Sequence, residues 1–206
     1  LLGTGSGPFI GAVVGISYSN DYVLNCHTVG ECSSTITYSS QITTGGVIGC
    51  NYASGMGGNK LLMYRCSAEI DETIKLGNTS FIFAGLLGRG ENATLYMYDC
   101  VANARVNCSG GSYNHTGVAI GWTPSPSVFE NVVGTLDVTA TNKHSSGALL
   151  ACSYNQITIR NIYVEGHIGA TDETKNSIHA VVGGYKIAVA SNVNVVKDTA
   201  SYAPLA

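Results

Sequence analysis

Short apolar runs that end in glycine, or in one case alanine, recur along the chain. Each is followed by a polar stretch and then by a segment in which apolar and polar residues alternate. The six runs are GAVVG (11–15), GGVIG (45–49), AGLLG (84–88), GVAIG (117–121), GALLA (147–151) and HAVVG (179–183). Their last residues are separated by 34, 39, 33, 30 and 32 positions. A near-constant period in this range is typical of repeat architectures, in which each unit buries its apolar face against its neighbours.

The alternating segments predict β-strands. Alternation with a period of two is typical of half-buried strands, and these segments are rich in Val, Ile, Thr and Tyr. No segment combines a 3.6-residue apolar period with helix-capping residues. We therefore predict an all-β fold, a parallel β-helix (β-solenoid) of about six coils with little or no helix.

This pattern also predicts the domain organisation. A single solenoid domain over residues 9–197 follows an N-terminal segment, 1–8, and precedes a C-terminal tail, 198–206. The repeats fall near residues 11–44, 45–83, 84–116, 117–146, 147–178 and 179–197. Because no amphipathic helix or charged cap flanks them, we expect other copies or neighbouring domains of a larger chain to cover the ends of the solenoid.

Placing the units in register predicts two structural columns. Equivalent residues of successive coils stack about 4.8 Å apart, and stacked Asn side chains can pair their amides. The predicted ladder consists of Cys26, Cys66, Cys100, Asn131, Asn161 and Asn192. Glycine is favoured where the backbone bends sharply or another segment approaches. The predicted structural glycines are Gly15, Gly49, Gly88, Gly121 and Gly183.

The combination of an apolar glycine run (GGVIG, AGLLG) with a following strand that carries Asn-Cys or Cys near its middle (VLNCHTVG, MYDCVANA) resembles the GLUG repeat. The resemblance covers residues 9 to about 197. GLUG repeats occur in bacterial adhesin-like proteins and surface proteases and in large protist surface proteins. The resemblance implies a β-solenoid on an extracellular surface protein, and it provides no catalytic residues to transfer.

Composition narrows the class of protein. Only 11% of residues are charged and the net charge is −3, which argues against a nucleic-acid-binding protein. No apolar run approaches the roughly 20 residues of a membrane span. Seven cysteines are suggestive of an oxidising compartment, and four glycosylation sequons favour a secreted or cell-surface glycoprotein. The sequons begin at Asn78, Asn92, Asn107 and Asn114.

Two disulfide schemes are compatible with the cysteine spacing. Local pairs would join Cys26 to Cys32 and Cys100 to Cys108. Alternatively, neighbours in the column would pair across coils, such as Cys66 with Cys100, since the stacking distance lies within the disulfide range. Because the number of cysteines is odd, at least one is free or pairs with another chain.

Cys50 and Cys152 occupy the same position after the glycine motif, three coils apart. They are candidates for an intermolecular bridge, and free buried thiols are the alternative. No Cys-x-x-Cys occurs, and Cys26 and His27 are adjacent and so point to opposite faces of a strand. No metal site and no cofactor is predicted.

The sequence also argues against an enzyme. Its only adjacent acid pairs, Asp71-Glu72 and Asp172-Glu173, lie in loop-like stretches and are interpreted as solvated turns. Arg65 and Arg160, the candidate bases of a lyase, flank the column at outward positions with no acid cluster beside them. We predict no catalytic residues.

The favoured function is therefore a structural subunit or stalk segment of an extracellular filament or surface coat, assembling by end-to-end or lateral packing with other copies of itself. The alternative is a surface adhesin or carbohydrate-binding module with ligand-binding loops at 51–60, 103–116 and 122–127; a polysaccharide lyase or hydrolase is less favoured. Tyrosines near the repeat strands either cover strand faces or bind sugar rings or a partner. They are Tyr64, Tyr96, Tyr98, Tyr154, Tyr163 and Tyr185.

Overall fold

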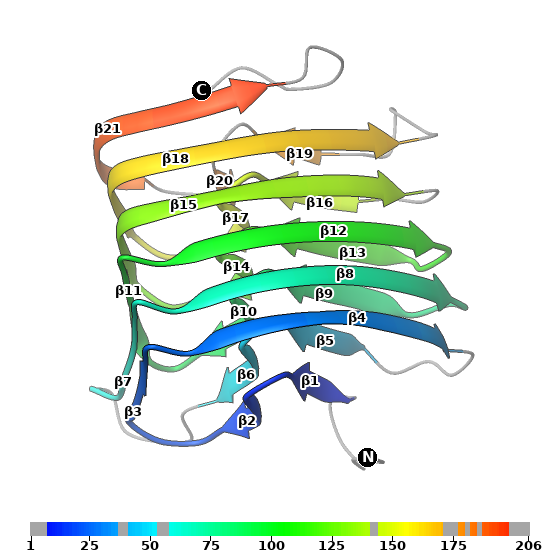
Figure 1. Cartoon of the computed structure of the whole chain (residues 1–206), viewed down its shortest axis with the longest axis horizontal. Coiled ribbons are helices and arrows are strands. Elements are labelled where there is room, and N and C mark those ends of the chain that lie inside the picture. Colours follow the sequence, from blue (N-terminus) through cyan, green and yellow to red (C-terminus); the bar gives the residue numbers. More distant parts are fainter. Residues whose placement is uncertain are drawn as a thin grey trace.

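The structure, a computed structural model, is a parallel β-solenoid (Figure 1). It describes residues 8–36, 41–52, 58–140, 144–170, 177–179, 182–184 and 187–197. Every regular element in these ranges is a strand, and neighbouring strands pair in parallel. None of the described ranges holds a helix of the length and hydrophobicity that a membrane crossing requires. The predicted fold class is confirmed.

Three sheets run along the solenoid. Sheet A contains β1 (Phe9–Gly11), β5 (Ile42–Gly45), β9 (Ser80–Ala84), β13 (Tyr113–Gly117), β16 (His144–Gly147) and β19 (Ser177–His179). Sheet B contains β2 (Val14–Ser17), β6 (Ile48–Tyr52), β10 (Leu87–Glu91), β14 (Ile120–Thr123), β17 (Leu150–Ser153) and β20 (Val182–Gly184).

Sheet C forms the long wall of the solenoid. In the first three turns it is built from two strands per turn, and in the later turns from one longer strand. Its strands are β3 (Asp21–Leu24), β4 (His27–Ile36), β7 (Lys60–Tyr64), β8 (Ser67–Leu76), β11 (Thr94–Tyr98), β12 (Val101–Ser109), β15 (Ser127–Ala140), β18 (Ile157–Ala170) and β21 (Ile187–Lys197).

The glycine motifs lie where sheet A passes into sheet B. Their first residues pair in register, as Gly11 does with Gly45, and so do their fourth residues, as Leu87 does with Ile120. Sheets A and B therefore have one strand for each of the six motifs. About four turns are stacked on both sides, and the first and last turns form the ends.

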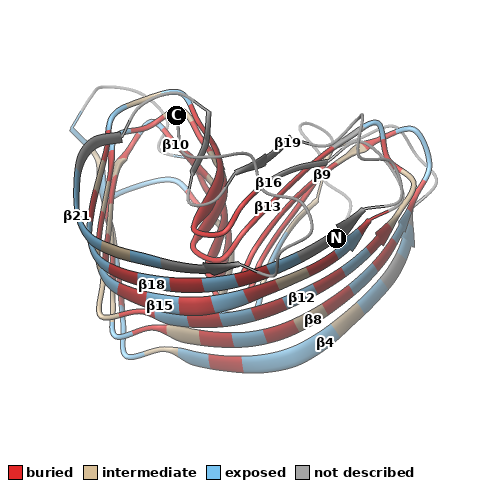
Figure 2. Ribbon diagram, turned by 90° about the horizontal axis from the view of Figure 1, so that it is seen from above, coloured by how far each residue is buried: buried red, intermediate tan, exposed pale blue. Residues whose placement is uncertain are grey.

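Sheets A and B meet in a sharp fold that points towards the curved wall of sheet C (Figure 2). The motif glycines permit this fold because a side chain at their positions would collide with backbone. A Cβ on Gly88 would lie 2.6 Å from the carbonyl oxygen of Gly49 and 2.7 Å from Cγ2 of Thr43. The predicted role agrees with the packing at Gly49, Gly88 and Gly121, where a Cβ would lie within 2.7 Å of a backbone oxygen. At Gly15 the nearest atom would be 3.3 Å away, so the constraint is weaker there.

The interior between the fold and sheet C is filled with apolar side chains. Leu86 at the tip of the fold and Phe83 on sheet A are buried, as is Phe129 on sheet C. Backbone hydrogen bonds continue through the tip, where the amide of Leu86 donates to the carbonyl of Val118 at 3.2 Å. The core is thus one continuous column, shared by all the turns.

Candidate functional site: the bend ladder and the tyrosine face

A bend divides sheet C in every turn, and one residue at each bend has a left-handed backbone. We call these six residues the bend ladder. They are Asn25 (φ 55°), Arg65 (52°), Asp99 (55°), Asn131 (56°), Asn161 (52°) and Asn192 (51°). Asn and Asp tolerate this conformation better than most residues, which explains why they hold five of the six positions.

The predicted column of three cysteines and three asparagines is wrong by one residue. Tyr98 pairs with Glu130 and Val101 with Val133, so Asn131 stands beside Asp99 and not beside Cys100. The cysteines follow the bend residue and point inwards, where later turns have Val or Ile. The prediction placed the inward-pointing cysteines and the outward-pointing asparagines in one column.

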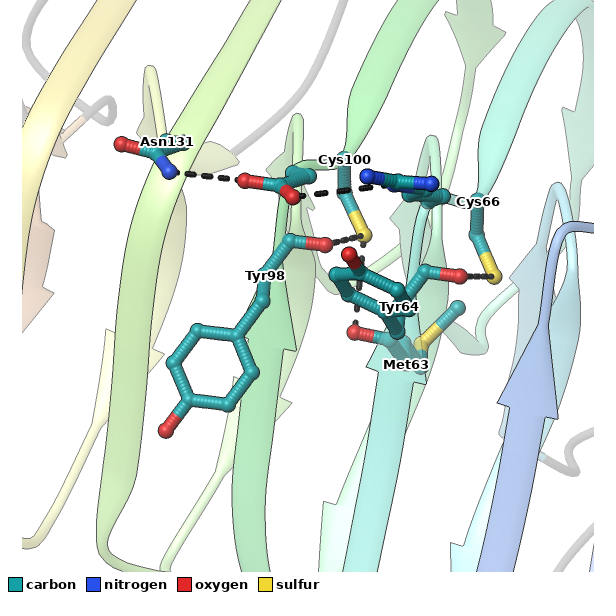
Figure 3. A network of polar contacts seen from close by, with 8 residues as sticks. Met63, Tyr64, Cys66, Tyr98, Cys100 and Asn131 are labelled. Carbon is teal, nitrogen blue, oxygen red and sulfur yellow. Dashed lines mark hydrogen bonds and ion pairs between the residues drawn. The ribbon is translucent and has the colours of Figure 1, made fainter.

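Within the ladder, the predicted pairing of Asn amides is present. Nδ2 of Asn192 donates to Oδ1 of Asn161 at 3.1 Å, and Nδ2 of Asn161 donates to Oδ1 of Asn131 at 2.9 Å. Asn131 donates in turn to Oδ1 of Asp99 at 2.7 Å, and Oδ2 of Asp99 lies 3.9 Å from Nε of Arg65 (Figure 3). The hydrogen bonds all run in one direction, from the last turn towards the first.

The inward column is a stack of thiols. Sγ of Cys100 lies 3.3 Å from the carbonyl oxygen of Tyr98 and 3.7 Å from that of Met63 in the preceding turn (Figure 3). Sγ of Cys66 lies 3.1 Å from the carbonyl oxygen of Val23, again in the preceding turn. The hydrogen bond with Cys66 and burial together raise the pKa of the Cys100 thiol. These buried thiols act as weak donors that satisfy backbone carbonyls.

All seven cysteines are free in the structure, so neither predicted scheme of intrachain disulfides is supported. Cys26 and Cys32 are six positions apart along sheet C, and Cys100 and Cys108 are eight positions apart. At about 3.3 Å per residue, both pairs are far beyond the disulfide range. Cys66 and Cys100 are neighbours across turns, yet both are present as thiols.

Cys50 and Cys152 are both buried in sheet B. They are 0% and 7% exposed, and Arg89 and Trp122 separate them in the register of sheet B. This confirms the three-turn separation. It favours the alternative of buried free thiols over an intermolecular bridge.

Three of the four predicted glycosylation asparagines, Asn78, Asn92 and Asn107, have exposed side chains. Asn114 is 0% exposed on sheet A, and its Nδ2 donates to the carbonyl oxygen of Gly110 at 3.3 Å. A glycan on Asn114 is incompatible with this packing, so that assignment is wrong.

The acid pair Asp71-Glu72 lies within β8 and not in a solvated turn, which corrects the sequence interpretation. Asp172-Glu173 falls outside the described residues. Asp71 faces solvent and pairs with Arg105 at 2.8 Å, whereas Glu72 faces the core. Across the described ranges, no three His, Cys, Asp or Glu side chains converge in a way that could hold a metal ion.

Glu72 is an isolated carboxyl group inside the solenoid. It is 2% exposed, and neither of its oxygens has a hydrogen-bond partner among the described residues. Cys32 stands beside it on the neighbouring strand. Burial raises the pKa of Glu72 from 4.5 to about 7, and the Cys32 thiol opposes this shift. Strand alternation places this residue inward, so the signal was present in the sequence.

An open groove of about 370 Å³ crosses the outer face of sheet C. Its lining includes Glu31, Glu69 and Asp137, and Arg105 lies between Asp71 and Asp137.

The prediction of a ligand-binding loop at 103–116 is wrong over most of its length, because β12 and β13 occupy most of this range. Likewise, 122–123 belong to β14.

An aromatic surface lies on the first half of sheet C, next to the bend ladder. Its side chains come from β3, β7 and β11, which pair in register. We call it the tyrosine face, and it consists of Tyr22, Leu24, Leu62, Tyr64, Tyr96 and Tyr98. Tyr22 is 70% exposed, and the rings of Tyr96 and Tyr98 are 6.1 Å apart.

The remaining predicted tyrosines lie elsewhere. Tyr163 is exposed on β18, on the other half of sheet C. Tyr154 follows sheet B, and its ring lies 5.9 Å from that of Trp122. Tyr185 is outside the described residues. Sequence reasoning missed Tyr22, although its alternation with Val23 marks it as outward-facing.

Comparisons with known proteins found no match, so the function has to be inferred from the fold and these surfaces. No protein-family model matches the chain, and no curated protein or solved structure matches it at a significant level. The chain is a parallel β-solenoid repeat protein by its own structure.

Proposed function

We propose that the chain is a structural solenoid segment, a subunit or stalk of an extracellular filament or surface coat, that extends by head-to-tail stacking. The polarity of the bend ladder supports this proposal. Because the amides of Asn192, Asn161 and Asn131 all donate towards the first turn, Oδ1 of Asn192 is left as an acceptor at the last turn. Asn25, at the bend of the first turn, carries an amide that can donate to such an acceptor. Both side chains are exposed and occupy equivalent bend positions. A second solenoid stacked in the same direction would join donor to acceptor.

The edges of the sheets favour the same arrangement. Among the described strands, β1, β2, β3 and β4 lie at one end of their sheets, and β19, β20 and β21 at the other. In the first turn Val14 and Cys26 are only half-buried, whereas Ile48 and Cys66 at the equivalent positions of the next turn are buried. Stacking would pair the open edges and bury these residues.

The setting of this function is part of the proposal. The resemblance of the glycine motif to GLUG repeats, together with the exposed sequons at Asn78, Asn92 and Asn107, supports a secreted or cell-surface location. The partners are other copies of the chain or neighbouring domains of a larger one. This function involves no catalytic step.

The test is self-association of the purified chain, measured by sedimentation velocity and negative-stain electron microscopy. Asn25→Asp replaces the terminal donor with a carboxylate and keeps a residue type that Asp99 already places at a bend. The lost hydrogen bond and the repulsion between oxygens should raise the concentration for half-assembly by about tenfold.

Asn103→Asp is the matched control, because it makes the same charge change on an exposed residue away from both ends. Asn103 accepts a hydrogen bond from Thr135 at 3.0 Å, and Asp retains this acceptor. A wild-type chain that stays monomeric at all concentrations contradicts the proposal, and so does equal loss of assembly in both variants.

A further inference from the structure

The tyrosine face changes character along the solenoid axis. Its two outward columns are apolar or aromatic in the first three turns. In the next two turns the equivalent positions hold Val128 and Thr158 in one column, and Glu130 and Arg160 in the other. The aromatic part is therefore a bounded patch and not a stripe along the whole solenoid.

The patch is too small for a stable protein interface. Three turns span about 10 Å along the axis, and the two columns are about 7 Å apart on each strand. Its footprint is on the order of 100–300 Å², against about 800 Å² that each partner buries in a standard protein–protein interface. An extended, narrow polymer that packs on only a few tyrosine rings fits these dimensions better than a second protein.

Hydrogen-bonding groups border the aromatic rings on one side. The guanidinium of Arg65 lies 4.9 Å from the ring centre of Tyr64, and its Nε lies 3.9 Å from Asp99. Asn131 is exposed beside Asp99. A row of donors and acceptors along an aromatic patch offers a ring surface and polar partners to the same ligand.

The charges at this border are balanced. Arg65 pairs with Asp99, and Arg160 lies 3.7 Å from Glu130. No unpaired cation is available to attract an anionic polymer, and no unpaired carboxylate to attract a cationic one, among the described residues of the border. Lys60 is exposed on β7 at the edge of the face away from the bend, two residues before Leu62. Beside Tyr64 and Tyr98, at the bend, the balanced charges favour a ligand without charge.

We propose that the tyrosine face binds a neutral, unbranched oligosaccharide. The C–H faces of successive pyranose rings pack on Tyr64, Tyr96 and Tyr98, and the sugar hydroxyls exchange hydrogen bonds with the bend ladder at Arg65 and Asp99. The residues proposed to contact the sugar lie in the second and third turns, whereas the proposed stacking uses the first and last turns. The two proposals can therefore be tested independently.

The experiment measures binding of neutral β-1,4-linked hexasaccharides of glucose and of N-acetylglucosamine by calorimetry, with an oligogalacturonate of equal length as the anionic comparator. Tyr96→Ala removes one ring from the patch and should weaken binding about tenfold or more. Tyr96→Phe keeps the ring and should retain most of the affinity. Tyr163→Ala removes an exposed tyrosine elsewhere on sheet C and should leave affinity unchanged.

Trp122 fluorescence reports folding of each variant from sheet B, away from the patch. Absence of binding to both neutral hexasaccharides overturns the proposal. Equal weakening by Tyr163→Ala also overturns it, as does tighter binding of the oligogalacturonate. If Tyr96→Ala abolishes self-association while leaving hexasaccharide affinity unchanged, the patch is a protein interface and the proposal is wrong.

Discussion

Nδ2 of Asn161 lies 2.9 Å from Oδ1 of Asn131, a residue 30 positions earlier in the chain. Both residues have left-handed backbones, with φ values of 52° and 56°. The bend in sheet C therefore selects Asn twice, once for its backbone tolerance and once for an amide that both donates and accepts. Side-chain contacts between bend residues thus join successive turns from Arg65 to Asn192.

Substitutions at Asn131 separate these two roles. Asn131→Ala removes the ladder hydrogen bonds and leaves an unfavourable φ, so it should lower the free energy of unfolding by about 2 kcal/mol. Asn131→Gly removes the same hydrogen bonds but accepts the positive φ, and should lower it by only about 1 kcal/mol. Urea denaturation measures both. Equal losses would show that backbone strain has no part in the choice of Asn.

Glu72 should make stability depend on pH. Its pKa is raised to about 7 in the folded chain, so folding favours the protonated acid. Stability should be greatest below about pH 4.5 and fall as the pH rises through 7. Glu72→Gln should match the wild type at pH 4 and exceed its unfolding free energy by about 3 kcal/mol at pH 8. The measurement is chemical denaturation across this range. Identical pH profiles would mean that the carboxyl group is not buried as described.

Gly88→Ala tests the close packing of sheets A and B. The added Cβ would lie 2.6 Å from the backbone oxygen of Gly49, so the backbone of the neighbouring turn would have to shift. We expect a loss of about 3 kcal/mol or more, seen as a lower thermal midpoint. Gly30→Ala on β4 is the control, because nothing lies within 4 Å of its Cβ position, and it should be neutral or slightly stabilising. A similar midpoint for the two variants would contradict the packing.

Thiol labelling should distinguish two classes of cysteine. Cys26 and Cys32 are partly exposed, and the other five are buried. A thiol reagent applied to the native chain and followed by mass spectrometry should modify the first two and spare the rest, whereas the unfolded chain should react at all seven. Fast native reaction at Cys50 or Cys152 would contradict their burial.

Much of the fold could be predicted because the solenoid repeats its constraints. The glycine motifs mark the junction of two sheets in every turn, and their register in the structure is the one that their alignment predicts, as in the pairing of Gly11 with Gly45. Alternation identified the strands for the same reason, since each has one face against the core.

The errors arise where local pattern is ambiguous. The left-handed bend residue interrupts alternation, so Cys100 and Asn131 looked equivalent although they point to opposite sides of the wall. Asp71 and Glu72 resemble a polar turn, yet a strand can bury one acid while its neighbour stays in water. Asn114 carries a sequon, but its burial depends on packing across turns, which a triplet does not encode.

The parallel pairing of the strands fixes the length that each turn adds to the solenoid. Successive motifs are 30 to 39 residues apart, and yet every turn adds the same increment of about 4.8 Å, because hydrogen bonds between strands set the rise. Residues inserted at a corner between sheets widen the cross-section without lengthening the rod. Gain or loss of a whole repeat changes the length of the solenoid by about 4.8 Å.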